Sequence, residues 1–211
     1  RKGITGAVGF VPTMGALHAG HLSLVKKSCN RCRNTIVSIY LNPSQFSPSE
    51  DLDSYPIKVN NDIEQLKHYQ PDCIFLPSDS EMYPKGFSSA IQAADISNVL
   101  EGKSRPHFFQ GVTTIVSKLF NIVEPSHAFF GEKDAQQLRI IQKMVIDLNF
   151  PIEIISCPIV REKNGLAMSS RNQHLTIEER ERASVVFLGL ESGRELLIAG
   201  EKNAQIIRNK I

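Results

Sequence analysis

The stretch Ala7-Val8-Gly9-Phe10-Val11-Pro12-Thr13-Met14-Gly15-Ala16-Leu17-His18-Ala19-Gly20-His21 decides the fold class. Its first half is apolar and rich in valine, which predicts a buried strand over residues 7–12. The glycines of its second half allow a tight turn, and Leu22, Val25 and Cys29 then recur at helical spacing. A strand, a turn and a helix in this order indicate the first unit of a parallel α/β sheet.

The same alternation of short apolar runs and helical periods continues along the chain. It predicts strands at residues 35–41, 72–76, 127–130 and 152–157, and helices at residues 111–123 and 134–148. Between Leu76 and Gly111 prolines and glycines interrupt the pattern, so we expect an irregular insertion with one short strand near residues 90–93. The whole pattern predicts a doubly wound, Rossmann-like parallel sheet.

The composition changes after Arg171. Thr176 and Glu179 form a Thr-x-x-Glu capping pattern, which predicts a helix that runs to about Ala199. We therefore expect a Rossmann-like domain over residues 1–172 and the incomplete start of a smaller C-terminal domain over residues 173–211.

Charge and hydropathy exclude several classes of protein. The chain of 211 residues has 24 Lys and Arg against 22 Asp and Glu, a formal net charge of +2. No field of one sign marks it as a ligand of nucleic acid or membranes. An apolar run of about 18 residues, which a membrane span needs, does not occur. Since no secretory leader is visible either, we expect a cytoplasmic protein.

The four cysteines do not form an evident metal or redox site. Cys29 and Cys32 have the spacing of half a zinc site, but Cys73 and Cys157 stand alone. Cys29 also lies on the apolar stripe of the first predicted helix, where a thiol packs as a small hydrophobe. We expect neither zinc nor redox chemistry at these positions.

Two histidines follow the first strand at the start of the first helix. Free N–H groups at a helix start, together with the imidazoles of His18 and His21, are suitable donors for a phosphate anion. A zinc site would need a third ligand, and no Cys, Asp or Glu occurs between Gly9 and Ser28. The His-x-Gly-His pattern resembles the ATP signature of nucleotidyltransferases and class I aminoacyl-tRNA synthetases.

Three further polar segments have the character of ligand-binding loops. They are Leu41-Asn42-Pro43-Ser44-Gln45-Phe46, Gly131-Glu132-Lys133-Asp134-Ala135-Gln136-Gln137 and Met168-Ser169-Ser170-Arg171-Asn172. The first two follow predicted strands, where ligands bind in open α/β sheets. Asp134 is suited either to a ribose hydroxyl or to capping the next helix. The third resembles the mobile Lys-Met-Ser-Lys-Ser loop of the same superfamily, with Arg171 as its cation and the serines as phosphate donors.

Together these four segments resemble the pantothenate synthetase family from about residue 7 to residue 175. The resemblance implies an ATP-dependent, AMP-forming ligase that condenses pantoate with β-alanine. It implies a pantoyl-adenylate intermediate, release of pyrophosphate, magnesium as a companion of ATP, and a homodimer.

The resemblance also implies roles for individual residues. It places ATP contacts at Met14, Gly15, Ala16, Leu17, His18, Ala19, Gly20, His21, Gly131, Glu132, Lys133, Asp134, Val160, Met168, Ser169, Ser170 and Arg171. His21 corresponds to a catalytic residue with an acid role. Gln45 corresponds to a ligand of both pantoate and β-alanine, Gln137 to a pantoate ligand, and Asn42 to a further substrate contact.

Two departures from the family pattern stand out. Phe108 occupies a position where the family commonly has histidine, and Asn60-Asn61-Asp62 replaces an acidic run, which leaves Asp62 as the carboxylate expected near magnesium.

Other functions stay open. A cofactor adenylyltransferase would share the first motif but would not need Gln45 and Gln137. A tRNA-charging fragment lacks the basic surface it would need. A non-catalytic nucleotide sensor is a third alternative.

Overall fold

The computed structural model describes residues 3–48 and 50–211, and the chain divides into two compact units, Arg1–Pro158 and Ile159–Ile211. The domain boundary expected after residue 172 stays a prediction.

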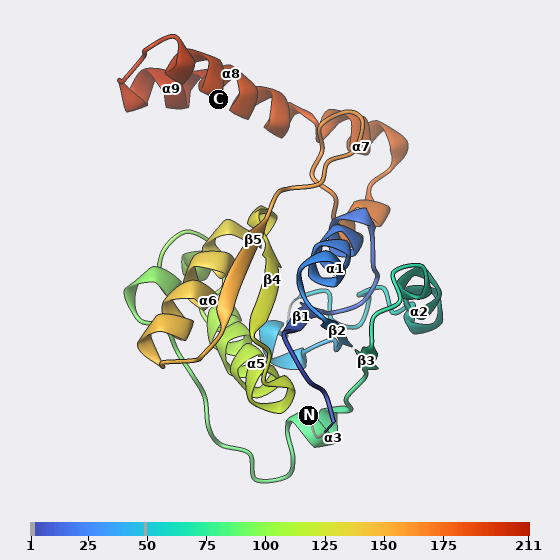
Figure 1. Cartoon of the computed structure of the whole chain (residues 1–211). Coiled ribbons are helices and arrows are strands. Elements are labelled where there is room, and N and C mark those ends of the chain that lie inside the picture. Colours follow the sequence, from blue (N-terminus) through green and yellow to red (C-terminus); the bar gives the residue numbers. More distant parts are fainter. Residues whose placement is uncertain (1–2, 49) are drawn as a thin grey trace. The chain divides into compact units, whose positions relative to one another are not determined.

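The first unit is built on a five-stranded sheet with the order β3-β2-β1-β4-β5 (Figure 1). Its strands are β1 (Val8–Thr13), β2 (Asn34–Ile39), β3 (Cys73–Phe75), β4 (His127–Gly131) and β5 (Glu153–Cys157). Gly9 of the central strand β1 pairs with Thr35 on one side and with His127 on the other. All pairings are parallel, which confirms the predicted doubly wound sheet. Each strand also overlaps a predicted one.

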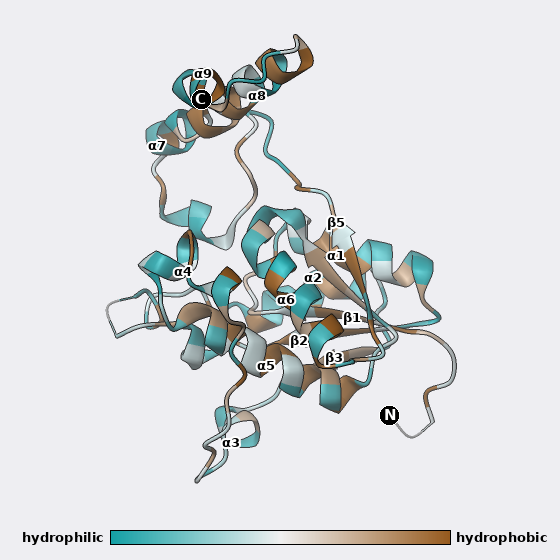
Figure 2. Ribbon diagram, turned by 90° about the vertical axis from the view of Figure 1, so that its left-hand side faces the viewer, coloured by the Kyte–Doolittle hydropathy of each residue, from teal (hydrophilic) through white to brown (hydrophobic). Residues whose placement is uncertain are grey.

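Helices cover both faces of this sheet. The helices are α1 (Ala19–Arg31), α2 (Val59–Lys67), α5 (Phe108–Val123) and α6 (Ala135–Asp147). Because successive side chains of a strand point to opposite faces, Phe10 joins the core cluster that contains α5 and α6, and Val11 joins the cluster that contains α1 and α2. Figure 2 shows hydrophobic strands between helices that carry hydrophilic residues.

The segment between β3 and α5 is irregular, as predicted, with the short helices α3 (Asp79–Met82) and α4 (Glu101–Ser104) and the 3₁₀ turn η2 (Asp95–Ser97). The strand expected near residues 90–93 was wrong, since these residues are not in a strand. Ile91 shows why. Its N–H donates to the hydroxyl of Thr114 and its carbonyl accepts from Thr113, so side chains of α5 bind the backbone groups that a neighbouring strand would use.

The second unit contains the 3₁₀ turn η4 (Ser170–His174) and the helices α7 (Ile177–Arg182), α8 (Val185–Ile198) and α9 (Ala204–Lys210). The capping box of Thr176 and Glu179 is present, as predicted. The expectation of one helix to Ala199 was wrong because the chain turns at residues 183–184. There the Ser184 hydroxyl donates to the carbonyl of Glu181 at 2.6 Å, in competition with the helical bonding pattern.

Across residues 3–48 and 50–211, none of the helices combines the length and the apolar character needed to cross a membrane.

Candidate active site

The carboxyl ends of β1 and β4 form the switch point of the sheet. These neighbouring strands are followed by helices on opposite faces, α1 after β1 and α6 after β4. In open α/β sheets the ligand binds in the crevice between such ends. A cavity of about 160 Å³ lies here, a size that suits a small organic acid better than a whole nucleotide.

The cavity brings together side chains from four segments. It is lined by Pro12, Thr13, Met14, His21, Leu24, Tyr40, Asn42, Gln45, Val112, Ile115, Val116, Leu119, Phe129, Phe130, Gly131, Asp134 and Gln137. Seven of these residues were expected at the site from the sequence: Met14, His21, Asn42, Gln45, Gly131, Asp134 and Gln137. Most of its polar groups come from the loops that follow the strands and from the first turns of α1 and α6, and α5 supplies an apolar wall.

The two histidines of the first loop hold each other in place. His18 is the N-cap of α1, and its Nδ1 accepts the N–H of Gly20 at 3.1 Å. In return the N–H of His18 donates to Nδ1 of His21 at 3.4 Å. The rings face each other with centroids 4.0 Å apart and an angle of 34° between their planes. The pair forms a capping box built from imidazoles.

Both rings are neutral at pH 7. Burial, with the neighbouring His18 ring and the Lys133 ammonium, lowers the pKa of His21 to about 3. Burial and then the charge of Lys133 lower the pKa of His18, against a smaller opposing effect of Asp134. Since Nδ1 of each ring accepts a hydrogen bond, the ring proton belongs on Nε2.

This arrangement corrects one expectation. The main-chain N–H groups of His18 and Gly20 are used by the two rings, so they are not the free donors expected at this helix start. The Nε2–H groups of His18 and His21 remain as donors for an anion.

Gln45 reaches the cavity from the loop after β2. It ends the 3₁₀ turn η1 (Pro43–Gln45) and is 8% exposed. Gly111 allows this position: a Cβ on Gly111 would lie 2.3 Å from the carbonyl oxygen of Ser44 and 3.0 Å from the nitrogen of Gln45. The carbonyl of Gln45 accepts from Arg105 at 3.2 Å. The close approach of Gly111 and the hydrogen bond from Arg105 fix the backbone of Gln45, and the backbone in turn positions the Gln45 side chain at the cavity.

Asn42 is buried and held by hydrogen bonds within the protein. Its Oδ1 accepts from the hydroxyls of Tyr83 at 2.8 Å and Ser44 at 3.0 Å, and its Nδ2 donates to the carbonyl of Gly111 at 3.3 Å. The amide orientation is thereby fixed, with one Nδ2 hydrogen left over for the cavity.

The segment after β4 supplies the opposite rim. The 3₁₀ turn η3 (Glu132–Asp134) leads into α6. Asp134 lines the cavity and pairs with Lys133 at 3.0 Å. Asp134 also occupies the N-cap position of α6, although its side chain makes no capping bond. Gln137 faces the cavity, whereas Gln136 binds the carbonyls of Ile96 and Val99.

Five of the expected ATP contacts, Val160, Met168, Ser169, Ser170 and Arg171, belong to the second unit. The N–H of Met168 donates to the carbonyl of Val160 at 3.0 Å, and Ser169 accepts from the N–H of Arg171, with Ser170 next in the same turn. Asn172 donates to Glu162 at 2.9 Å, and so joins this turn to the preceding segment. Within this unit, hydrogen bonds thus join Val160 to Met168 and Ser169 to Arg171.

Other expected residues lie outside the lining of the cavity: Gly15, Ala16, Leu17, His18, Ala19, Gly20, Glu132 and Lys133. Asp62 is fully buried, and its two oxygens accept the N–H groups of Ala16 and Leu17. In the described part of the chain no three His, Cys, Asp or Glu side chains group as a metal site.

Sequence reasoning missed the apolar wall and Tyr40. Val112, Ile115, Val116 and Leu119 of α5 line the cavity, but their helical spacing indicates only a buried face. Tyr40 lies next to the last residue of the predicted second strand and has no motif of its own. Gly111 was the one available signal, since a glycine at a helix start indicates a close backbone approach.

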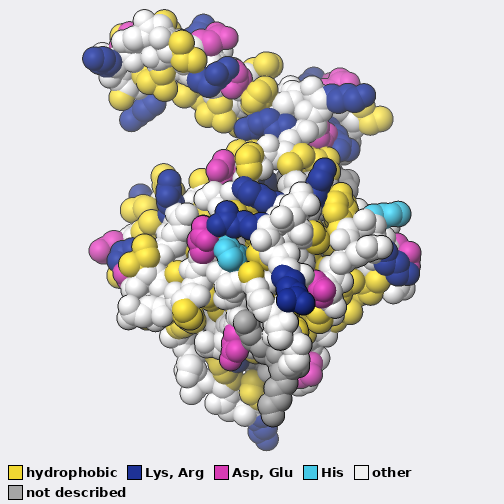
Figure 3. Space-filling view, in the orientation of Figure 1, with side chains coloured by type: hydrophobic (Ala, Val, Ile, Leu, Met, Phe, Trp, Pro, Cys, Tyr) yellow, Lys and Arg dark blue, Asp and Glu magenta, His cyan; other side chains and the backbone are white. Residues whose placement is uncertain are grey.

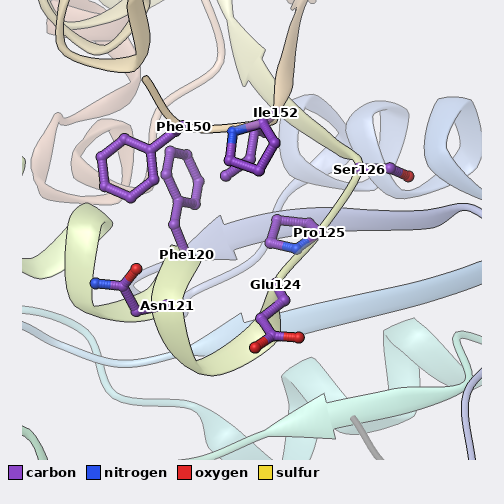
Figure 4. A pocket seen from close by; sticks show the side chains of 8 residues that line it. Phe120, Asn121, Glu124, Pro125, Ser126, Phe150 and Ile152 are labelled. Atoms are coloured by element: carbon purple, nitrogen blue, oxygen red, sulfur yellow. The ribbon is translucent and has the colours of Figure 1, made fainter. Parts of the chain in front are cut away.

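A second cavity, of about 450 Å³, lies at the amino ends of β4 and β5 (Figure 4). It is lined by Phe120, Asn121, Glu124, Pro125, Ser126, Phe150, Pro151 and Ile152. None of these residues was expected to bind a ligand.

Charged groups are mixed on the surface. Figure 3 shows Lys and Arg side chains beside Asp and Glu side chains. The ion pair of Arg31 with Glu153, at 2.8 Å, is one example.

Comparisons with known proteins show to which family the chain belongs. The sequence model of the family described as Pantoate-beta-alanine ligase matches residues 1–211. The pantothenate synthetase of Thermosipho africanus is 50% identical over 205 residues, which are 97% of this chain and 74% of that protein. That of Acetivibrio thermocellus is 51% identical over 211 residues, which are 100% of this chain and 75% of that protein.

Solved structures agree as well. The pantothenate synthetase of Thermus thermophilus matches with a TM-score of 0.94 and 44% identity, over 97% of this chain and 74% of that one. The pantoate-beta-alanine ligase of Francisella tularensis, solved with beta-gamma ATP and beta-alanine, matches with a TM-score of 0.83 and 43% identity, over 87% of this chain and 70% of that one. The chain therefore belongs to the pantoate-beta-alanine ligase family.

Proposed function

We propose that the cavity at the switch point binds pantoate and that ATP reacts with it there. The ligase reaction of this family is ATP-dependent and joins pantoate to β-alanine. In the first step a carboxylate oxygen of pantoate attacks the α-phosphorus of ATP, and the bond to the leaving pyrophosphate breaks. In the second step the amine of β-alanine attacks the acyl carbon, and AMP leaves. The observation that carries the proposal is the meeting of seven expected residues in one small cavity.

Pantoate is the ligand that fits the chemistry of the cavity. Gln45 and Gln137 offer neutral amides, and a neutral partner leaves the carboxylate nucleophilic, whereas a tightly paired cation would blunt it. The apolar side chains of α5, such as Val116, suit the dimethyl carbon of pantoate. The same Gln45 is proposed to contact β-alanine, and Asn42 to offer its remaining Nδ2 hydrogen.

The imidazoles are proposed to bind phosphate oxygens as neutral donors. Attack by a carboxylate at phosphorus moves no proton, so this step needs hydrogen-bond donors for the growing negative charge rather than an acid that gives up its proton. The Nε2–H of His21, whose pKa is lowered to about 3, is such a donor. The proposal thus makes His21 a neutral hydrogen-bond donor, whereas the resemblance implies an acid. Gly131 to Asp134 are further proposed ATP contacts of the first unit. Val160 and Met168 to Arg171 of the second unit stay predicted ATP contacts.

Magnesium is proposed to arrive with ATP, held by triphosphate oxygens and water. The described residues do not fit a resident metal site, since no three ligand side chains group together and both oxygens of Asp62 accept main-chain N–H groups. A homodimer and a cytoplasmic location stay predictions.

The experiment that tests the proposal is pyrophosphate exchange. Pantoate alone should support exchange of labelled pyrophosphate into ATP, and β-alanine should then release AMP and pantothenate. A product of ADP and orthophosphate, or exchange that requires β-alanine, would contradict the adenylate mechanism.

A further inference from the structure

The loop that precedes the two histidines has an unfavourable backbone. Gly15 and Ala16 both have positive φ angles, +86° and +50°. Glycine tolerates this region, but a residue with a Cβ is disfavoured there. Ala16 therefore needs contacts elsewhere that hold it in this conformation.

Asp62 of α2 supplies those contacts. Its Oδ2 accepts the N–H of Ala16 at 2.8 Å, and its Oδ1 accepts the N–H of Leu17 at 2.7 Å. Two successive N–H groups that converge in this way form an anion-binding nest, and here the anion is a side chain of the protein. Hydrogen bonds to a carboxylate are stronger than those between neutral groups.

The same helix holds the loop at a second point. Gln65 donates from Nε2 to the carbonyl of Leu17 at 3.4 Å. Residues three apart share one side of a helix, so Asp62 and Gln65 bind the N–H and the carbonyl of Leu17 from the same side of α2. Leu66, which is 0% exposed, fixes this helix in the core cluster that also contains Leu17.

We infer that Asp62 is a positioning residue for the ATP-dependent step and not a metal ligand. This inference rests on the proposed function, in which His18 and His21 bind phosphate. Leu17 directly precedes His18, so the bonds from Asp62 set where the helix begins and where both rings lie. Asp62 is 0% exposed, and both of its carboxylate oxygens are already used as acceptors of main-chain N–H groups.

The test compares Asp62→Asn with Glu64→Gln in the full chain. Asparagine replaces one carboxylate oxygen, a hydrogen-bond acceptor, with an NH2 group that would face a main-chain N–H. Glu64 serves as the control because it is an exposed carboxylate of the same helix, bound to Lys67. Asp62→Asn should lower kcat/KM for ATP in pyrophosphate exchange by roughly tenfold to a hundredfold. The KM for β-alanine and the magnesium concentration for half-maximal activity should not change. Glu64→Gln should match the wild type.

A second substitution separates positioning from metal binding. Ala16→Gly removes the Cβ that makes the positive φ unfavourable, so in the Asp62→Asn background it should restore exchange by about fivefold. No recovery, together with a raised magnesium requirement, would overturn the inference. If Asp62→Asn does not fold, Gln65→Ala, which removes only the carbonyl bond, should still lower kcat/KM for ATP and leave the KM for β-alanine unchanged.

The outcomes also separate this inference from the proposed function. Wild-type ATP kinetics in Asp62→Asn beside an inactive His21→Ala would refute the positioning role alone. Full exchange activity in His21→Ala would refute the proposed function itself.

Discussion

The imidazoles of His18 and His21 lie with centroids 4.0 Å apart, and each ring accepts a main-chain N–H through its Nδ1. Because both rings are fixed through the same kind of atom, both present Nε2–H as the remaining donor. Two neutral donors are thus fixed in place beside the cavity before any ligand binds, which is the preorganisation that electrostatic stabilisation of a transition state requires.

The first prediction concerns the loss of these donors. His21→Ala should lower the rate of pyrophosphate exchange by about 10²- to 10³-fold, or about 2.7 to 4 kcal/mol, and His18→Ala by less. His68→Ala is the matched control, because His68 is an exposed histidine outside the site. Exchange rates at saturating pantoate give the comparison, and near-wild-type exchange in His21→Ala would remove the assigned role.

The second prediction concerns stability against pH. The pKa of His21 is lowered from 6.5 to about 3, so between these values the unfolded chain binds a proton that the folded chain does not. Stability should therefore fall as the pH falls through this window, by about 2 kcal/mol at pH 5 from His21 alone. Urea unfolding at pH 7 and pH 5 measures the loss. In His21→Asn, which cannot titrate, the loss should be smaller by that amount, and an equal loss in both proteins would contradict the neutral ring.

The third prediction separates two adjacent glutamines. Gln137→Ala should raise the KM for pantoate by roughly tenfold, since a hydrogen bond to a charged ligand is lost, and should leave the KM for ATP unchanged. Gln136→Ala is the control, because Gln136 binds the carbonyls of Ile96 and Val99 instead of facing the cavity. That variant should lose stability and keep its KM for pantoate. A change in ATP dependence alone for Gln137→Ala would refute the assignment to pantoate.

The fourth prediction concerns a close backbone approach. A Cβ at Gly111 would lie 2.3 Å from the carbonyl oxygen of Ser44, so Gly111→Ala must displace η1 and with it Gln45. The variant should lose about 1 to 3 kcal/mol of unfolding free energy and bind pantoate more weakly. Asn121→Ala, at an exposed position of the same helix, should do neither. Unfolding curves and the KM for pantoate test both effects, and unchanged pantoate binding would show that η1 does not position Gln45.

The sequence predicts the sheet well because local patterns determine its parts. The valine-rich run before Pro12 and the motif from Met14 to His21 place a strand, a turn and a helix without reference to the rest of the chain. Ile91 illustrates the opposite case. Its segment has the apolar character of a short strand, but hydroxyls of Thr113 and Thr114 bind its backbone groups. No local pattern shows that such distant side chains will be nearby.

The candidate site likewise has some features that local motifs predict and others that depend on distant contacts. Gln45 and Gln137 are identified by their motifs and do line one cavity. The N–H groups of the first loop, in contrast, depend on partners that only the fold supplies. Asp62 lies 46 positions from Ala16 in the chain, and its expected place near magnesium rested on the family resemblance, which says nothing of its hydrogen-bond partners. Its buried position between two N–H donors gives it a different role.

The pairing of β1 with β4 has a consequence for synthesis of the chain on the ribosome. Val8 and Ser126, which hydrogen-bond across these strands, are 118 positions apart. At about 5 to 20 residues per second, roughly ten seconds pass between the translation of β1 and the translation of β4. During this time the side of β1 that pairs with β4 has no partner on the nascent chain and is a candidate for chaperone binding. The histidine loop is made early, but its catalytic surroundings are completed only after Gln137 has left the exit tunnel.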